Sequence, residues 1–303
     1  MNRTFTIISP HFQQFKTDDW SDWFLVKLVH FLPSFSAVML KNATSNINCT
    51  NYHVVVRGMG KAFPAIPLHR RQGITDVLLG YLRKSASVIN APVCRQGIQS
   101  DAQWLEANLG PFSPYTTYAD LKVFNLSGVA VVDSLSPKQK AELILDPGSG
   151  ALDNETIVRE VFTSLTESPD DEQLNQFFQA FTKINQQRNT TLIVNPDVRA
   201  TILNLTLTAL APEFEDFEPK DFELWFQVNL ATVLASLSPG SLVVIPGNIS
   251  CASYAAILTG LQQSLRSLPL HVSQGVRSSA ESLKKRFTRT LTHFFTKIQL
   301  PLP

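Results

Sequence analysis

The chain has 303 residues and a formal net charge of +1, so it can bury one large core or two ordinary ones. This charge gives no indication of a nucleic-acid or polyanion partner. Glycine is scarce, with 13 residues beside 20 phenylalanines, and the 18 prolines fall between apolar segments. This composition favours packed helices over a turn-rich all-β fold.

Helical periodicity is the dominant local pattern. Two short apolar runs, 53–57 and 242–245, fit either strands or buried helical segments. The DPGSG stretch at 146–150 is interpreted as a turn between two helices. The segments expected to be helical are, in chain order, 19–32, 72–85, 100–109, 136–145, 153–166, 168–187, 195–210, 218–236 and 251–265.

Three of these segments begin with a Ser-Pro or Asn-Pro pair, which suits a helix N-cap followed by proline at the first helical position. The pairs begin at Ser136, Ser168 and Asn195. The helix expected at 168–187 has acidic residues in its first turn. Its apolar face consists of Leu174, Phe177, Phe178, Phe181 and Ile184.

The chain contains an internal duplication with a period of about 202 residues. Residues 10–74 align without a gap over 212–276, and 22 of these 65 positions are identical. Chance would match about one position in fifteen. The aligned pairs include Cys49 with Cys251 and Tyr52 with Tyr254.

This period divides the chain into an unusual frame. Residues 1–45 are the C-terminal part of a preceding unit, 46–247 are one complete unit, and 248–276 begin the next. Residues 277–303 form a divergent basic tail, which is expected to be poorly ordered or to form an amphipathic helix able to touch a membrane surface. We expect such a chain to be a slice of a longer array or a truncated isoform.

Three tryptophans mark a weaker sub-period. Trp23, Trp104 and Trp225 are separated by intervals near two and three times 40 residues, and two-helix solenoid units run about 40–47 residues. Stacked helix pairs of this kind contact only their neighbours. Core packing is the expected role of these tryptophans, and exposed anchoring of a partner is the alternative.

N-glycosylation sequons are more numerous than expected. Eight Asn-x-Ser/Thr triplets occur, whereas this composition would give about three by chance. The excess favours an extracellular glycoprotein. The terminal Asn2 is the weakest candidate, and the others are Asn42, Asn48, Asn125, Asn154, Asn189, Asn204 and Asn248.

The cysteines are consistent with an oxidising compartment. The complete unit holds only Cys49 and Cys94, whose disulfide would close a loop of about 46 residues and contribute about 3–4 kcal/mol. Cys251 repeats Cys49, but Thr296 occupies the place where its partner would fall. Free buried thiols in a cytosolic solenoid are the alternative.

The sequence shows no enzyme motif. It lacks a G-x-S-x-G elbow, a P-loop, an H-E-x-x-H helix and a G-x-G-x-x-G loop. His69 and His271 occupy equivalent repeat positions, which suits a structural feature better than a catalytic base. No CxxC or HxxxH spacing suggests a metal site. We therefore expect no catalytic residue, no metal, no cofactor and no small-molecule substrate.

The segment 104–145, together with the NCTNY and NISCASY starts, resembles the repeat region of the mesothelin, otoancorin and stereocilin family, and is most similar to its large fish members. The shared pattern is W-L-x-x-N, S-P-x-Q-x-A-x-L and C-x-x-Y, and it covers most of residues 5–276. The resemblance implies a right-handed, all-α superhelix of armadillo or HEAT type. It also implies extracellular adhesion to a mucin-like glycoprotein or a matrix.

The sequence thus predicts a non-enzymatic adhesion protein at the cell surface, binding an extracellular glycoprotein or matrix component. The first residues do not form a signal peptide, and no segment is apolar enough for an anchor. Any membrane association is therefore expected to be indirect. An intracellular helical-repeat adaptor is the alternative, and cysteine redox state and glycan occupancy distinguish the two.

Overall fold

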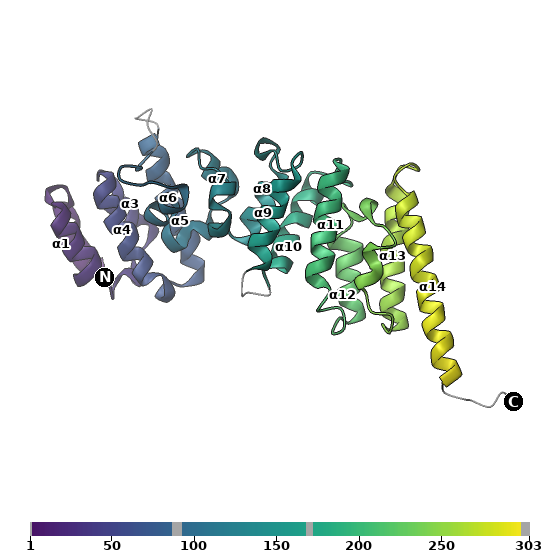
Figure 1. Cartoon of the computed structure of the whole chain (residues 1–303). Coiled ribbons are helices and arrows are strands. Elements are labelled where there is room, and N and C mark those ends of the chain that lie inside the picture. Colours follow the sequence, from purple (N-terminus) through teal and green to yellow (C-terminus); the bar gives the residue numbers. More distant parts are fainter. Residues whose placement is uncertain (1, 87–92, 168–171, 298–303) are drawn as a thin grey trace. The chain divides into compact units, whose positions relative to one another are not determined.

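The computed structural model describes residues 2–86, 93–167 and 172–297, and every regular element in these ranges is helical (Figure 1). The all-α expectation is confirmed. The chain forms two compact units, Met1–Gln139 and Lys140–Pro303. The boundary between these units does not coincide with the boundaries of the 202-residue sequence repeat, because the units are defined by packing in space and the repeat by residue identity.

The first unit contains α-helices of varied length, 3₁₀ turns and one π-helical turn, η2. α4 lies against α2, η2, η3, α6 and η5, while α5 packs on α3 and η5. Its elements are α1 (Asn2–Ile8), η1 (Ser9–Gln14), α2 (Thr17–Asp22), η2 (Trp23–Lys27), η3 (Leu32–Ser34), α3 (Ala37–Thr44), α4 (Cys49–Ala62), η4 (Phe63–Ala65), α5 (Leu68–Ala86), α6 (Asp101–Asn108), η5 (Gly110–Tyr115), α7 (Tyr118–Lys122) and η6 (Val129–Ser134).

The second unit begins inside α8 (Pro137–Leu145). Within it α9 packs on α10 and α11, and α13 packs on α12, η8 and α14. Its further elements are η7 (Pro147–Ser149), α9 (Glu155–Thr166), α10 (Gln173–Gln187), α11 (Pro196–Leu210), α12 (Pro219–Glu223), η8 (Leu224–Asn229), η9 (Leu234–Ser236), η10 (Ser241–Val244), α13 (Cys251–Ser267) and α14 (Gln274–Lys297).

Helix starts follow the side chains that cap them. The Asn195 side chain accepts hydrogen bonds from the Asp197 and Val198 backbone N–H groups, with Pro196 at the first helical position. The Ser136 hydroxyl likewise accepts from the Gln139 N–H at 3.3 Å. These caps confirm two of the three predicted starts. The third, at 168–171, lies outside the described residues.

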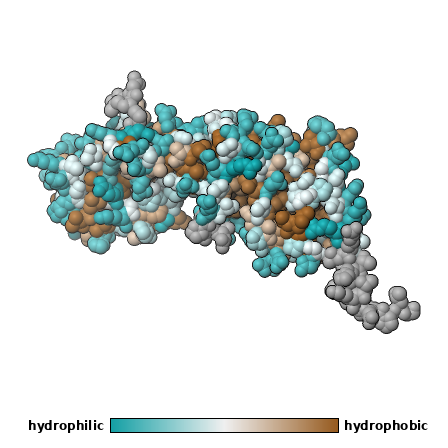
Figure 2. Space-filling view, viewed as in Figure 1, coloured by the Kyte–Doolittle hydropathy of each residue, from teal (hydrophilic) through white to brown (hydrophobic). Residues whose placement is uncertain are grey.

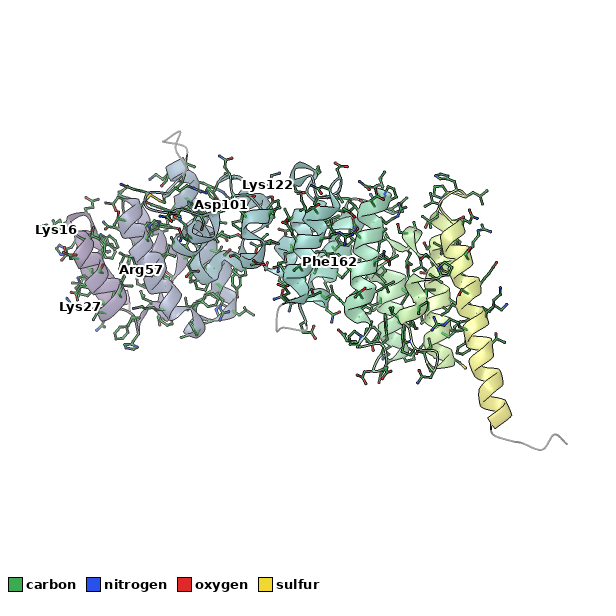
Figure 3. All side chains as sticks on the ribbon, in the orientation of Figure 1. Lys16, Lys27, Arg57, Asp101, Lys122 and Phe162 are labelled. Atoms are coloured by element: carbon green, nitrogen blue, oxygen red, sulfur yellow. A yellow bond between two sulfur atoms is a disulfide. The ribbon has the colours of Figure 1, made fainter. Side chains whose placement is uncertain are left out.

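Aromatic side chains fill both cores. In the first unit Trp20 and Phe24 are fully buried, with ring centroids 5.3 Å apart. In the second unit the predicted apolar face of α10 packs against Phe162 of α9, which is labelled in Figure 3. On the face shown in Figure 2, the surface of each unit mixes hydrophilic and hydrophobic residues without a single dominant patch.

The segments 19–32 and 218–236 are not continuous helices, contrary to expectation. Each begins as an α-helix, widens into one π-helical turn at η2 or η8, and ends in a 3₁₀ turn. α4 and α13 approach these π-helical turns closely, each at a glycine. A Cβ on Gly58 would lie 2.7 Å from the Phe24 carbonyl oxygen, and one on Gly260 would clash with the Phe226 carbonyl oxygen.

Two other segments take helical forms that the sequence left open. Residues 53–57 lie inside α4, and 242–244 lie in the 3₁₀ turn η10. Part of the basic tail is helical as well, because α14 extends to Lys297. Leu283 of this helix is buried. In an amphipathic tail helix, the apolar face would comprise Leu283, Phe287, Leu291, Phe294 and Ile298. The side chains of the last three lie outside the described residues.

Candidate functional surface

The predicted disulfide is present. Cys49, the first residue of α4, is bonded to Cys94, and their Cα atoms lie 5.2 Å apart. The bond joins the N-terminus of α4 to the segment that leads into α6. Cys251 is free and exposed, at the equivalent place in the first turn of α13.

Polar contacts hold the segment that contains Cys94 and leads into α6. The Trp104 indole donates to the Val93 carbonyl oxygen at 2.6 Å. Asp101, labelled in Figure 3, pairs with Arg95 and accepts from the Ser127 N–H at 2.8 Å. Burial opposes ionisation of the Asp101 carboxyl, but the Ser127 and Arg95 hydrogen bonds and the Arg95 charge outweigh it and lower its pKa.

Tyr52 connects α4 to α6. Its hydroxyl donates to the Asn108 carbonyl oxygen at 2.8 Å, and its ring stacks on Tyr81 at 4.0 Å. Burial, with a smaller contribution from Tyr81, raises the Tyr52 pKa well above its ordinary value. The neighbouring His53 ring shares a 3.1 Å hydrogen bond with the Asn108 side chain. Burial and the Arg57 charge lower the His53 pKa despite this bond.

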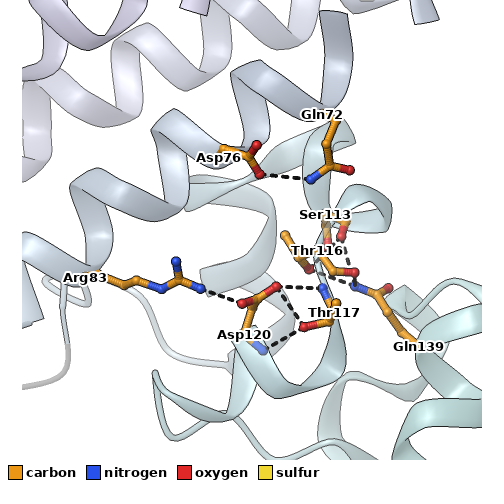
Figure 4. Close-up of polar contacts among 8 residues, drawn as sticks. All are labelled: Gln72, Asp76, Arg83, Ser113, Thr116, Thr117, Asp120 and Gln139. Carbon is orange, nitrogen blue, oxygen red and sulfur yellow. Dashed lines mark hydrogen bonds and ion pairs between the residues drawn. The ribbon is translucent and has the colours of Figure 1, made fainter. Parts of the chain in front are cut away.

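A second polar network in the first unit joins α5 to α7 and α8 to η5 (Figure 4). The buried Gln139 amide donates to the carbonyl oxygens of Ser113 and Thr116. Asp120 forms a capping box with Thr117 and an ion pair with Arg83. Each of these side chains either forms a hydrogen bond with a backbone group or pairs with an opposite charge. The network is therefore suited to fixing helices and not to proton transfer.

The seven stronger sequon asparagines are all exposed. The other seven asparagines whose burial is described differ sharply: only Asn46 is exposed, two are half-buried and four are buried. The exposed sequon positions are Asn42, Asn48, Asn125, Asn154, Asn189, Asn204 and Asn248.

Local backbone geometry presents several of these asparagines. Asn48 and Asn154 are N-caps, and their side-chain Oδ1 atoms accept the capping hydrogen bonds, whereas a glycan attaches to the side-chain nitrogen. Asn125 and Asn189 have φ of 55° and 53°, a conformation that asparagine tolerates at turns. Asn204 lies within α11 and is exposed, which a glycan at this position would require.

The repeat markers have unequal surroundings. Trp104 and Trp225 are buried, which matches a core role, while Trp23 is half-buried and stacks on Phe15. Tyr52 is fully buried, but Tyr254 is only half-buried and stacks on Phe287 of α14 at 4.2 Å. Sequence identity at equivalent positions therefore does not imply equal burial.

A cavity of about 300 Å³ in the second unit was not indicated by the sequence. Neither atom of the buried Asn185 amide has a hydrogen-bond partner among the described atoms, nor does the Thr232 hydroxyl. The lining of this cavity includes both residues and contains amides and hydroxyls but no charged side chain. Such a lining suits neutral hydrogen-bonding molecules, water included.

The described residues contain no group of three His, Cys, Asp or Glu side chains placed to hold a metal ion. Within the same part of the chain, no helix is both long and apolar enough to span a bilayer. No family model, no curated protein and no solved structure matches this sequence.

Proposed function

We propose that this protein is a non-enzymatic, extracellular adhesion protein at the cell surface or in a matrix. It binds a glycoprotein or matrix ligand through the surface of a right-handed helical solenoid that repeats with a period of about 202 residues. The observation that carries the proposal is the exposure of every sequon asparagine whose burial is described, set against the burial of most other asparagines.

Exposure matters because a glycan cannot be accommodated in a core. Helix caps and turns alone do not account for the contrast, since Asn195 also caps a helix but is only half-buried and carries no sequon. The Cys49–Cys94 disulfide adds support, because such bonds persist mainly in oxidising compartments. An intracellular adaptor would need neither feature.

The adhesive role is supported by what the polar residues do. Asp101, Gln139 and Asp120 form hydrogen bonds with backbone groups or ion pairs within the first unit. The cavity beside Asn185 has no charged side chain in its lining. A repeated surface instead favours many weak contacts, whose combined avidity can exceed the affinity of each contact.

The test is secretion of the chain behind a heterologous signal peptide, followed by intact mass with and without glycosidase and by peptide mapping without reduction. We expect several occupied sequons and a Cys49–Cys94 linkage. The secreted protein should then bind mucin-coated or matrix-coated surfaces, more tightly as a multivalent display than as a single chain.

Retention and misfolding in the secretory pathway, beside a folded, reduced and unglycosylated cytosolic product, would favour the adaptor. Secretion with glycans but without binding to any coated surface would retain the compartment and reject the adhesive role.

A further inference from the structure

The cavity of about 300 Å³ in the second unit is lined by α10 and the residues that follow it, by η8 and the turn after it, and by α13. η8 packs on both α10 and α13. The lining combines buried residues such as Asn185 and Asn229 with exposed residues such as Gln186, Thr191 and Gln263. The cavity is therefore accessible from solvent and has a buried interior.

Two side chains in this lining have no hydrogen-bond partner among the described atoms. Asn185 is 3% exposed, and its Nδ2 and Oδ1 atoms are both unpartnered, as is the Thr232 hydroxyl. Their backbones are nevertheless fixed. The Asn185 carbonyl oxygen accepts from the Thr190 N–H at 2.9 Å, and the Thr232 carbonyl oxygen accepts from the Ile193 N–H at 3.0 Å. Because a buried amide without partners costs free energy, these groups are suited to a molecule that enters the cavity.

The packing of the repeat does not require this neutral polar lining. The corresponding positions in the first unit hold a lysine, a histidine and an alanine. The aligned pairs are Asn229 with Lys27, Thr232 with His30 and Ser264 with Ala62. Both copies still form a π-helical turn that packs on the following long helix, η2 on α4 and η8 on α13. Packing alone therefore does not account for the amides and hydroxyls of the second copy.

We propose that this cavity binds a neutral amino sugar, an N-acetylhexosamine, through its acetamido group. The acetamido carbonyl accepts from Asn185 Nδ2, while the amide N–H and a neighbouring ring hydroxyl supply donors for Asn185 Oδ1 and the Thr232 hydroxyl. Phe226, Val228 and Ala231 of the lining offer apolar surface to the methyl group and the ring carbons. The amides and hydroxyls of the lining suit an uncharged ligand.

The exposed part of the lining favours a sugar over a simple amide. Gln186, Thr191, Gln263 and Ser267 provide amides and hydroxyls there, which suit ring hydroxyl groups. The volume lies at the lower end of small-molecule sites, which span about 300–1,000 Å³, and so suits a single sugar unit. The origin of the sugar rests on the proposed function, since a glycoprotein ligand carries such units.

The test uses the full chain made without N-glycans in an oxidising bacterial periplasm, so that no sugar of the protein itself competes. The probe is N-acetyl-D-glucosamine, whose methyl signal is followed by saturation-transfer NMR. D-Glucose lacks the acetamido group and N-acetylglycinamide lacks the sugar ring, so both serve as references. We expect saturable binding of the probe with a Kd of about 1–10 mM, and binding at least about 10-fold weaker for each reference.

Asn185→Leu should weaken binding of the probe by at least about 10-fold, because its donor and acceptor are both lost. The urea midpoint should stay unchanged or rise, since the substitution removes an unpartnered buried amide. Thr232→Val keeps the shape of the side chain and should weaken binding by about 3-fold or more. Gln187→Leu, at an exposed position of α10 outside the lining, is the control and should leave the affinity unchanged.

The threonine variant also identifies the cavity. Asn185 borders a second cavity, and the lining of that cavity does not include Thr232. Weaker binding in both Asn185→Leu and Thr232→Val therefore assigns the sugar to the first cavity. If Asn185→Leu does not fold, Thr232→Val decides the test.

A lack of saturable binding of N-acetyl-D-glucosamine would overturn the proposal, as would an unchanged affinity in Thr232→Val. Equal affinity for D-glucose would reject the acetamido contact, and equal affinity for N-acetylglycinamide would reject the sugar as the ligand. These outcomes are distinct from failure of the proposed function, which is measured by secretion and by binding to coated surfaces. A chain that binds the free sugar but is not secreted would retain this site and reject the extracellular role.

Discussion

The Tyr52 hydroxyl donates a 2.8 Å hydrogen bond to the Asn108 carbonyl oxygen, 56 residues away in sequence. This bond closes α6 onto α4, and the hydroxyl also lies 3.4 Å from the Leu78 carbonyl oxygen of α5. One buried phenol therefore links three helices of the first unit.

Tyr52→Phe is expected to lower the free energy of unfolding by about 1–2 kcal/mol, because a buried carbonyl loses its donor while the ring remains. Urea unfolding followed by tryptophan fluorescence measures the change. Tyr254→Phe is the matched control and should change stability little, since Tyr254 is half-buried. Equal losses in the two variants would contradict this role of the Tyr52 hydroxyl.

Gly58→Ala is expected to destabilise the protein by about 1–3 kcal/mol, because the new methyl group meets the Phe24 backbone and the α4–η2 contact must open. Gly260→Ala should act in the same direction in the second unit. Gly80→Ala is the control: a Cβ there meets nothing within 4 Å, so it should stabilise α5 by about 0.5–1 kcal/mol. Thermal unfolding distinguishes the signs.

Cys94→Ser is expected to remove about 3–4 kcal/mol of stability through the loss of the constraint on the unfolded chain. Cys251→Ser should have almost no effect, because that thiol is exposed and unbonded. The measurement is urea unfolding with and without dithiothreitol. The reductant should destabilise the parent protein but leave Cys94→Ser unchanged.

Acid should reduce stability in two separate pH ranges. The pKa of His53 is lower in the folded protein than its ordinary value of 6.5, so the folded state favours the neutral ring. The resulting contribution to the free energy of unfolding is complete above pH 6.5 and is lost as the pH falls through the pKa of the folded state. The lowered pKa of Asp101 acts likewise below 3.8. His53→Gln should flatten only the upper range and Asp101→Asn only the lower. Urea midpoints measured from pH 8 to pH 2.5 test this separation.

Substitution of the asparagine in an occupied sequon should remove one glycan. Asn204→Gln in the secreted protein is expected to reduce the mass by one glycan, because this asparagine lies on the solvent side of α11. Asn46→Gln, at an exposed asparagine without a sequon, should leave the glycan mass unchanged. An unchanged mass for the substitutions at Asn42, Asn125, Asn189 and Asn204 would reject glycosylation as the reason for their exposure.

Sequence periodicity was sufficient to identify the helical class and much of the core. Four residues of the predicted α10 face, Leu174, Phe177, Phe178 and Phe181, are buried as predicted, and the fifth, Ile184, is half-buried, because an amphipathic helix has only one side that can leave water. The capping residues Ser136 and Asn195 were identifiable for a similarly local reason, since each cap acts within three residues. The two cysteines of the complete unit were also sufficient to predict their pairing.

The tertiary structure decided what each repeated residue does. Tyr52 and Tyr254 share a motif, yet one is fully buried under α6 and the other is half-buried on α14. The π-helical turns at η2 and η8 likewise had no local signal, and each contains the phenylalanine that Gly58 or Gly260 of another helix approaches closely. Local patterns fix which residues form helices and caps, whereas burial depends on neighbours distant in sequence, which no local pattern specifies.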